Sequence, residues 1–260
     1  MKIPPYEASG IEGCFNISPS SLATFIDNPE NWYKSHVTRE SRFAGNLNSV
    51  FGNIIHSGIE QFFNGEKLTT EDVQDYLDSY PDVDQWFILE WWEDSLKRAI
   101  EALEPLGCPD KQEVSINHKV ADGYSIGGKY DYRRGTTLGD YKTTSTAKSS
   151  IDSHKWQLME LAYIDRVHGV QTTHLEVVYI TRPVDAVEAT EISPKTGKLI
   201  GGKKEKPTTV KIVTYEIQDE DWITIEKKLK LVVRTMRVYR EQPELADVLF
   251  RPNEISYRQN

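Results

Sequence analysis

The sequence is poor in cysteine, with only Cys14 and Cys108 among its 260 residues. Two thiols are too few to hold a structural zinc ion or an iron–sulfur cluster through cysteine alone. We therefore expect no iron–sulfur cluster. The two thiols fit a protein of a reducing compartment, although a single disulfide between them stays open.

The chain also lacks any apolar run long enough to span a lipid bilayer. Its first residues, MKIPPYEASG, lack the apolar centre of a signal peptide. Both absences lead us to expect a cytoplasmic protein without a membrane partner. A GxxxxGK[ST] loop is absent as well, so the chain carries no sign of a helicase motor.

Positive charge is not in excess, because 31 lysines and arginines stand against 40 aspartates and glutamates, and the formal net charge is −9. This excludes a general basic coat for nucleic acid but leaves room for a local basic groove, since binding follows the local field. One candidate is a loop at about residues 193–207, rich in lysine, glycine and proline. Its Lys203 and Lys204 could contact phosphates, and the alternative is a solvated loop.

Sequence periodicity predicts helices first and strands later. The pattern predicts helices at about 19–27, 52–63, 84–103, 153–167 and 219–240, and strands at about 113–121, 124–133, 137–144, 173–181 and 209–217. This order favours a single domain over residues 1–260, of the mixed α/β class. A helical N-terminal part would cover about residues 17–105.

Acidic residues and a lysine meet on the predicted hairpin of residues 124–144. Asp140 and Lys142 point to the same side of one strand, because side chains alternate along a strand. The turn could place Asp131 opposite them, and Glu113 lies on the preceding strand. Neighbouring carboxylates repel each other, and a divalent cation such as Mg2+ or Mn2+ would relieve that repulsion. The alternative is a solvated hairpin with ordinary surface charges.

The segments GKYD and GDYKT resemble the core motif of the PD-(D/E)xK nuclease superfamily. The nearest pattern is that of the RecB-like branch, which includes RecB and AddB nuclease domains, CRISPR-associated RecB-like exonucleases and phage exonucleases. The resemblance implies a restriction-endonuclease-like core, a central mixed β-sheet flanked by helices. It also implies that Asp131, Asp140 and the Tyr141 carbonyl bind metal, and that Lys142 is catalytic.

Further segments support this resemblance. Gly52 and His56 match a Gly-x-x-x-His motif, which implies a metal ligand at His56. Glu113 resembles the acid that precedes the Gly-x-x-Asp strand, and Gln157 matches the first residue of a Gln-x-x-x-Tyr motif near DNA. Leu161 stands where that motif has tyrosine.

The opening segment NISPSSLATFIDNPENWY resembles the SxSxLxxFxxCPxxFY opening of the branch. Asn28 occupies the position of a cysteine that binds a cluster in some members. This substitution agrees with the expectation that no iron–sulfur cluster is present.

The resemblance implies a metal-dependent deoxyribonuclease, most simply an exonuclease acting on linear single- or double-stranded DNA in recombination or repair. Thr143 and Ser145, near Gln157, would contact the DNA backbone. A recombination or single-strand-annealing protein is a candidate partner, and a homo-oligomer stays open. A bacterial or phage-infected cytosol would be its location. The alternatives are a non-catalytic DNA-binding or assembly module with this fold and an RNA-directed nuclease.

Overall fold

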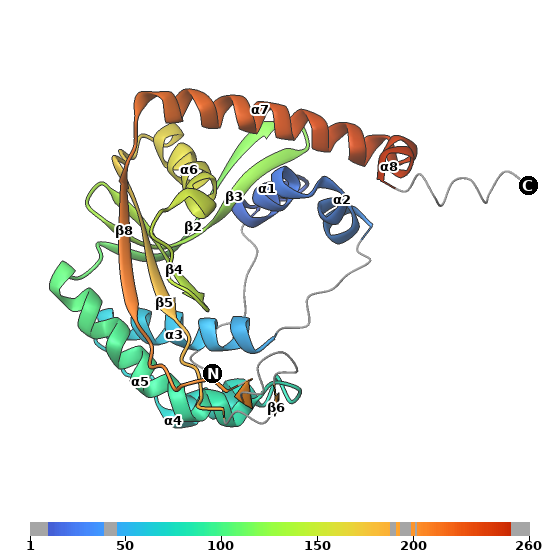
Figure 1. Cartoon of the computed structure of the whole chain (residues 1–260). Coiled ribbons are helices and arrows are strands. Elements are labelled where there is room, and N and C mark those ends of the chain that lie inside the picture. The colour runs from blue at the N-terminus through green and yellow to red at the C-terminus, as the bar shows by residue number, and fades with distance from the viewer. Residues whose placement is uncertain (1–9, 39–45, 188–190, 193–198, 201, 251–260) are drawn as a thin grey trace, which may run out of the picture.

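The computed structural model describes residues 10–38, 46–187, 191–192, 199–200 and 202–250 of the chain. Over these residues a mixed six-stranded sheet lies between two groups of helices (Figure 1). The strands of this sheet are β1 (Phe15–Ile17), β2 (Lys111–Ala121), β3 (Tyr124–Arg134), β4 (Thr137–Thr144), β5 (His174–Thr181) and β8 (Val210–Glu216). Two short strands, β6 (Glu191–Ile192) and β7 (Leu199–Ile200), pair with each other.

In the described part of the chain, five α-helices follow β1, one lies between β4 and β5, and two follow β8. They are α1 (Pro19–Asp27), α2 (Pro29–Trp32), α3 (Leu47–Phe63), α4 (Thr70–Leu77), α5 (Gln85–Leu103), α6 (Asp152–Val167), α7 (Asp219–Glu241) and α8 (Pro243–Phe250). None of the helices in the described ranges combines the length and apolar composition needed to cross a lipid bilayer.

Strand β3 organises the sheet. It pairs with β2 in an antiparallel ladder along its length, and its other edge pairs with β1 near one end and with β4 near the other. No strand pairs with that second edge at residues 127–131 in the described chain. Beyond β4 the order continues with β5, which is parallel to β4, and with β8 at the edge. The gap in pairing along β3 is where the functional side chains gather.

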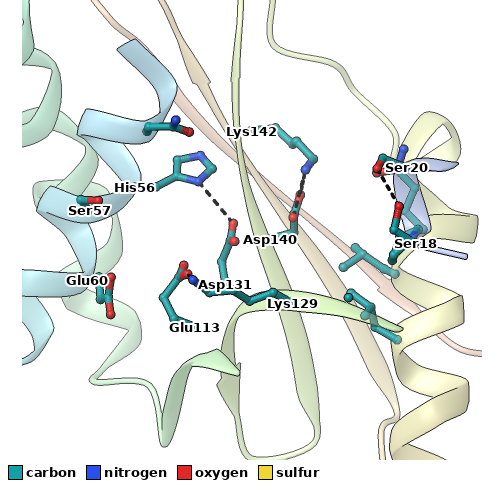
Figure 2. Close-up of a pocket in the computed structure, with 16 residues that line it drawn as sticks. Ser18, Ser20, His56, Ser57, Glu60, Glu113, Lys129, Asp131, Asp140 and Lys142 are labelled. Atoms are coloured by element: carbon teal, nitrogen blue, oxygen red, sulfur yellow. Dashed lines mark hydrogen bonds and ion pairs between the residues drawn. The ribbon is translucent and has the colours of Figure 1, made fainter. Parts of the chain in front are cut away.

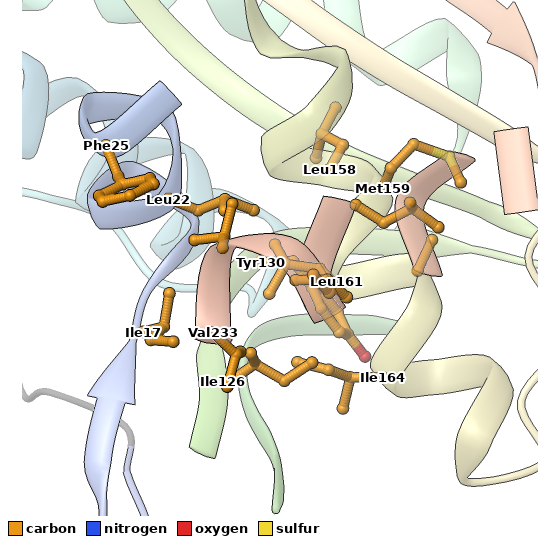
Figure 3. Close-up of a cluster of buried hydrophobic side chains, with 14 of the residues drawn as sticks. Ile17, Leu22, Phe25, Ile126, Tyr130, Leu158, Met159, Leu161, Ile164 and Val233 are labelled. Atoms are coloured by element: carbon orange, nitrogen blue, oxygen red, sulfur yellow. The ribbon is translucent and has the colours of Figure 1, made fainter. Parts of the chain in front are cut away.

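Each face of the sheet carries its own hydrophobic core. On one face α1, α6 and α7 pack against the sheet, with Leu22, Tyr130 and Leu158 among the buried side chains (Figure 3). On the other face α3, α4 and α5 enclose a second core that includes Tyr132 and Tyr141. Figure 1 shows the same division, with α6 and α7 on one side of the sheet and α3 and α5 on the other.

Strands β2 and β3 share a kink at one row. Tyr130 belongs to the first core and Tyr132 to the second, although a regular strand would place both on one face. Glu113, in register with the residue between them, has φ of 51°, a left-handed conformation that residues with a side chain seldom adopt. The kink therefore falls at Glu113 and Asp131.

The expected elements are present, with differences at their ends. Helix α3 begins at Leu47 rather than near Gly52, because Asn46 and Ser49 form a reciprocal capping box that starts the helix earlier. The pattern did not predict β1, α2, α4, α8 or the short strands β6 and β7. Of the predicted basic loop, residues 193–198 and 201 lie outside the described part of the chain. Cys14 and Cys108 are both free thiols.

Candidate active site

Strands β3 and β4 separate at the row formed by Tyr132 and Gly139. The ladder pairs these two residues, and its remaining pairs lie toward the turn. The next residues on the open side are Asp131 on β3 and Asp140 on β4. Instead of a main-chain carbonyl, the Oδ2 atom of Asp131 accepts the backbone N–H of Tyr141 at 2.5 Å. This fork between β3 and β4 therefore holds both predicted acids.

A cavity of about 290 Å³ opens at this fork. Side chains from α1, α3, α6 and three strands converge on it (Figure 2). Its lining residues are Ser18, Pro19, Ser20, Asn53, His56, Ser57, Glu60, Glu113, Gly128, Lys129, Asp131, Asp140, Lys142, Gln157, Leu158 and Leu161. Six predicted residues, namely His56, Glu113, Asp131, Asp140, Lys142 and Gln157, thus lie around one cavity.

The two acids and the lysine form an electrostatically coupled group. Burial raises the pKa of Asp131 well above its usual range, and the charge of Asp140 raises it further. The ammonium of Lys142 lies 2.7 Å from Asp140 Oδ2. Burial by itself would lower the pKa of Lys142, but the charges of Asp140 and Asp131 outweigh it and the pKa is raised. Lys142 therefore keeps its proton, and ionisation of the Asp131 carboxyl group costs free energy in this environment.

His56 presents a neutral imidazole to the same cavity. Burial and then the charge of Lys142 lower its pKa to about 4. Its Nδ1 lies 3.7 Å from Asp131 Oδ2, and its buried Nε2 has no hydrogen-bond partner among the described residues. A buried ring nitrogen without a partner is unusual, because buried polar atoms are normally satisfied. The arrangement leaves a donor atom available for a ligand.

Gly52 explains how α3 comes close enough to present His56. A Cβ atom at Gly52 would lie 2.6 Å from the Oγ1 atom of Thr143 on β4. Only glycine lets the helix and the strand approach to this distance. His56 lies one turn further along the helix, and its ring contacts the edge of the Tyr141 ring at 5.7 Å between centroids.

Glu113 forms an ion pair with Lys129, which lies two residues before Asp131 on β3. Its left-handed backbone turns the chain at the kink. Glu60, one helical turn beyond His56, faces the same region. Burial raises the pKa of Glu60, and the charge of Glu113 adds to the effect. The α3 side of the cavity thus has a surplus of carboxylates.

Helices α6 and α1 close the opposite side. A Cβ atom at Gly128 would lie 2.7 Å from Pro19 Cδ and 3.2 Å from Leu161 Cδ2, so glycine admits both helices to β3. Leu161, which replaces the tyrosine of the motif, packs here and lines the cavity with Gln157. His154, one turn before Gln157, lies near Lys142 and Asp140, and burial followed by the charge of Lys142 lowers its pKa.

Other predicted residues lie away from the cavity lining. The Tyr141 side chain is in the second core, so only its backbone lies near Asp131. Thr143 packs against Gly52, and Ser145 is exposed after the end of β4. Lys203 and Lys204 are exposed, and the backbone of Lys203 pairs with Val187.

The prediction missed several residues that line the cavity. Lys129 could have been found, because it is two residues from Asp131 on the same strand. Asn53 and Ser57 flank His56 on α3, and Ser20 follows the cap of α1. Ser20 belongs to the opening segment that resembles the branch's motif, whereas nothing in the local sequence distinguishes Asn53 or Ser57.

The sequence profile of the PD-(D/E)XK nuclease superfamily matches residues 16–245. This range covers most of the chain and every residue that lines the cavity, so the protein belongs to this superfamily. The resemblance stated from the short motifs is confirmed, and so is the mixed α/β fold with a central sheet flanked by helices.

Solved structures show how far the fold is shared. A candidate exonuclease from Eubacterium rectale matches with a TM-score of 0.52 at 12% identity, over 84% of this chain and 80% of that one. LHK-Exo, an alkaline exonuclease from Laribacter hongkongensis solved with dAMP, matches with a TM-score of 0.37 at 12% identity, over 91% of this chain and 95% of that one. A search of curated protein sequences gave no match.

Nucleases of this superfamily generally use divalent metal ions such as Mg2+ or Mn2+. In the conformations seen here, no three His, Cys, Asp or Glu side chains of the described residues are gathered tightly enough to hold an ion. The donor chemistry nevertheless fits a cation. His56 Nε2 has no hydrogen-bond partner among the described residues, and ionisation of Asp131 is disfavoured by burial and by the charge of Asp140. A divalent cation would relieve both conditions.

Proposed function

We propose that the protein is a metal-dependent deoxyribonuclease that degrades linear DNA from its ends during recombination or repair. The observation that carries the proposal is the meeting of Asp131, Asp140 and Lys142 in one cavity, next to the Nε2 atom of His56, which has no partner within the described part of the chain. Binding of DNA alone would not require two carboxylates at a fork between strands, because they repel phosphate.

In this proposal Asp131, Asp140, His56 and the backbone carbonyl of Tyr141 hold the cation. The bound ion would polarise a phosphate oxygen and lower the pKa of a water molecule. Glu113, across the kink from Asp131, would assist at the same place. The ligand set combines carboxylate and carbonyl oxygens with one imidazole, which suits Mg2+ and Mn2+.

Lys142 supplies the positive charge for the reaction. Hydrolysis forms a bond from the water oxygen to phosphorus, breaks one P–O bond, and moves a proton from the water to the leaving oxygen. Negative charge builds on the phosphoryl oxygens on the way. Because the pKa of Lys142 is raised, its ammonium remains protonated and can orient the water and offset that charge.

Contacts with the rest of the DNA would come from around the cavity. Gln157 lines it, and Thr143 and Ser145 follow Lys142 along β4. Lys203 and Lys204 would grip phosphates further away without reading sequence. Cleavage from an end is favoured by the described function of the E. rectale protein, a candidate exonuclease with the same fold.

The direct test is digestion of end-labelled linear DNA, single- and double-stranded, beside a closed circle and a matched RNA. Reactions would contain Mg2+, Mn2+ or EDTA, with wild type, Lys142→Ala and the control Lys97→Ala. Lys97 is an exposed lysine on α5 that pairs with Glu101. We expect metal-dependent loss of linear DNA with wild type and Lys97→Ala, and none with Lys142→Ala.

Other results of the digestion assay would change the proposal in different ways. Loss of the circle would make the protein an endonuclease, and preferential loss of RNA would change the substrate. Binding of DNA without cleavage under every condition would favour the non-catalytic module. Full activity of Lys142→Ala would overturn the assigned role of Lys142.

A further inference from the structure

A single row of side chains crosses four strands at the base of the fork. Tyr132 on β3 pairs with Gly139 on β4, Gly139 pairs with Glu176 on β5, and Glu176 pairs with Thr214 on β8. We call these four residues the cross-sheet row. It is the last row of the ladder between β3 and β4 before the strands separate.

Gly139 allows Tyr132 to reach across its neighbouring strand. A Cβ atom at Gly139 would overlap the Cζ, Cε2 and Oη atoms of the Tyr132 side chain. The phenol ring therefore lies over the place where any other residue on β4 would have its side chain. This requirement accounts for a glycine in the interior of a strand, where it otherwise costs stability.

Glu176 anchors the far end of the Tyr132 side chain. Its Oε1 atom accepts hydrogen bonds from Tyr132 Oη at 2.6 Å and from Arg134 Nη2 at 2.7 Å. Its Oε2 atom accepts one from Thr214 Oγ1 at 3.1 Å. The guanidinium of Arg134 also stacks over the Tyr132 ring, 4.6 Å from its centroid. Hydrogen bonds to a buried carboxylate are strong, so the ring has little freedom.

The fixed ring in turn contacts Tyr141, whose backbone carbonyl is a proposed metal ligand. Tyr132 and Tyr141 stack with their centroids 4.8 Å apart and their planes at 30°. The backbone N–H of Tyr141 binds Asp131, and the Tyr141 ring meets the ring of His56. A shift of Tyr132 would therefore reach Asp131 and His56 through Tyr141.

We propose that Tyr132, held by Glu176 across Gly139, is a positioning residue that sets the spacing of Asp131 and Asp140 for metal binding. The inference rests on the proposed nuclease function. Asp131 and Asp140 are the residues directly beyond the Tyr132–Gly139 pair, so the row fixes the point from which the two strands diverge. None of the four residues of the cross-sheet row lines the cavity.

A purely structural role makes a different prediction. If the row only stabilised the sheet, its loss would lower the free energy of unfolding and leave the metal affinity of the folded protein unchanged. If it positions the acids, metal affinity falls in protein that is still folded. Supporting contacts of metal ligands typically contribute about 10-fold or more to affinity.

The experiment measures Mn2+ affinity by calorimetry, the Mn2+ concentration that gives half-maximal cleavage, and the unfolding temperature in EDTA. The variants are Tyr132→Phe, which removes one hydroxyl, and Glu176→Gln, which keeps the size of the side chain. The control is Tyr215→Phe. Tyr215 donates a 2.7 Å hydrogen bond to Asp221 on α7, and neither residue lines the cavity.

We expect Tyr132→Phe and Glu176→Gln to weaken Mn2+ binding about 10-fold and to raise the half-maximal Mn2+ concentration in proportion. Tyr215→Phe should lower the unfolding temperature to a similar degree without changing Mn2+ affinity. DNA affinity in EDTA should stay the same in all three variants. If wild type is active and both test variants bind Mn2+ as tightly as wild type, the positioning role of Tyr132 is overturned while the proposed nuclease function stands.

Failure of the proposed function would look different. Wild type that binds no Mn2+ and cleaves no nucleic acid would remove the function and, with it, this role for Tyr132. Gly139→Ala serves as a second perturbation, because it displaces the ring without altering any hydrogen-bonding group. Folded Gly139→Ala with wild-type Mn2+ affinity would also contradict the inference.

Discussion

The carboxylate of Asp131 accepts the backbone N–H of Tyr141 at 2.5 Å, across the fork between β3 and β4. A side chain thus takes the place of the main-chain acceptor that a continuous ladder would supply. The bond ties an acid on one strand to the neighbour of an acid on the other. It keeps the two carboxylates near each other although their charges repel.

This relationship predicts that replacing the carboxylate of Asp131 raises the stability of the fold and abolishes activity. In Asp131→Asn the amide oxygen can still accept from Tyr141, while the repulsion with Asp140 disappears. We expect the variant to unfold at a higher temperature than wild type in EDTA and to lose cleavage. Mn2+ at 100 times its dissociation constant should stabilise wild type by about 2.7 kcal/mol and the variant by little. Equal stabilisation of both proteins by Mn2+ would exclude Asp131 as a ligand.

The contact between Gly52 and Thr143 predicts a rescue. In Gly52→Ala the new methyl group would lie 2.6 Å from Thr143 Oγ1, and we expect a loss of about 1–3 kcal/mol from overpacking. Thr143→Ala removes the hydroxyl and leaves the Cβ atom at 3.7 Å, an ordinary contact distance. The double variant should therefore recover most of the loss in urea unfolding. Additive losses would show that the two residues do not meet.

Part of the site follows from the sequence because it depends on local rules. Alternation along a strand places Asp140 and Lys142 together, and the structure has them 2.7 Å apart. A small residue one turn before His56 indicates close approach of a helix, and Gly52 meets Thr143 in that way. Both features can be predicted from local spacing, namely the two-residue alternation of a strand and the four-residue spacing of one helix face.

The rest depends on contacts between distant segments. The kink at Asp131 requires a left-handed backbone at Glu113, and no glycine marks that position. Tyr132 and Glu176 are 44 residues apart in sequence, so their hydrogen bond has no local signal. Helix α4 is different, since the capping box of Thr69 and Asp72 could have revealed it.

The Nε2 atom of His56, for which the described ranges hold no hydrogen-bond partner, leads us to expect that His56 matters more for Mn2+ than for Mg2+. Mg2+ favours oxygen ligands strongly, whereas Mn2+ accepts imidazole more readily. We expect His56→Ala to weaken Mn2+ binding by more than about 10-fold, and Mg2+ binding less. Calorimetry with both ions gives the comparison, and His118→Ala, a histidine of β2 outside the cavity lining, is the control. Unchanged affinity for both ions would return His56 to a structural role, and an equal loss for both would contradict the expected preference for Mn2+.

Lys203 and Lys204 predict a change in salt dependence. If both contact phosphates, Lys203→Gln/Lys204→Gln should reduce the slope of log affinity against log salt by about 1.8 on duplex DNA, or about 0.9 for each contact. The control is Lys227→Gln/Lys230→Gln, which removes two exposed lysines of α7. Fluorescence anisotropy across a salt series in EDTA measures both slopes. Identical slopes for wild type and the loop variant would identify the loop as solvated.

Glu160 on α6 predicts a stability that falls as pH rises. Its side chain is fully buried, and neither carboxylate oxygen has a hydrogen-bond partner in the described ranges. Burial raises the pKa of Glu160 well above its ordinary value of 4.5. Above about pH 4.5 the unfolded chain therefore releases the proton of Glu160, whereas the folded protein keeps it. The contribution of this proton to the free energy of unfolding is therefore fully present below pH 4.5. It is lost as the pH rises from 4.5 toward the raised pKa of Glu160 in the folded protein.

Glu160→Gln should remove this decline, because an amide has no proton to lose. We expect the variant to unfold a few degrees higher than wild type at pH 8, and to show a smaller advantage at pH 4.5. The control is Glu226→Gln, an exposed glutamate of α7 that pairs with Lys230. Thermal unfolding in EDTA at both pH values tests the sign. A larger advantage at pH 4.5 than at pH 8 would show that Glu160 is ionised in the folded protein.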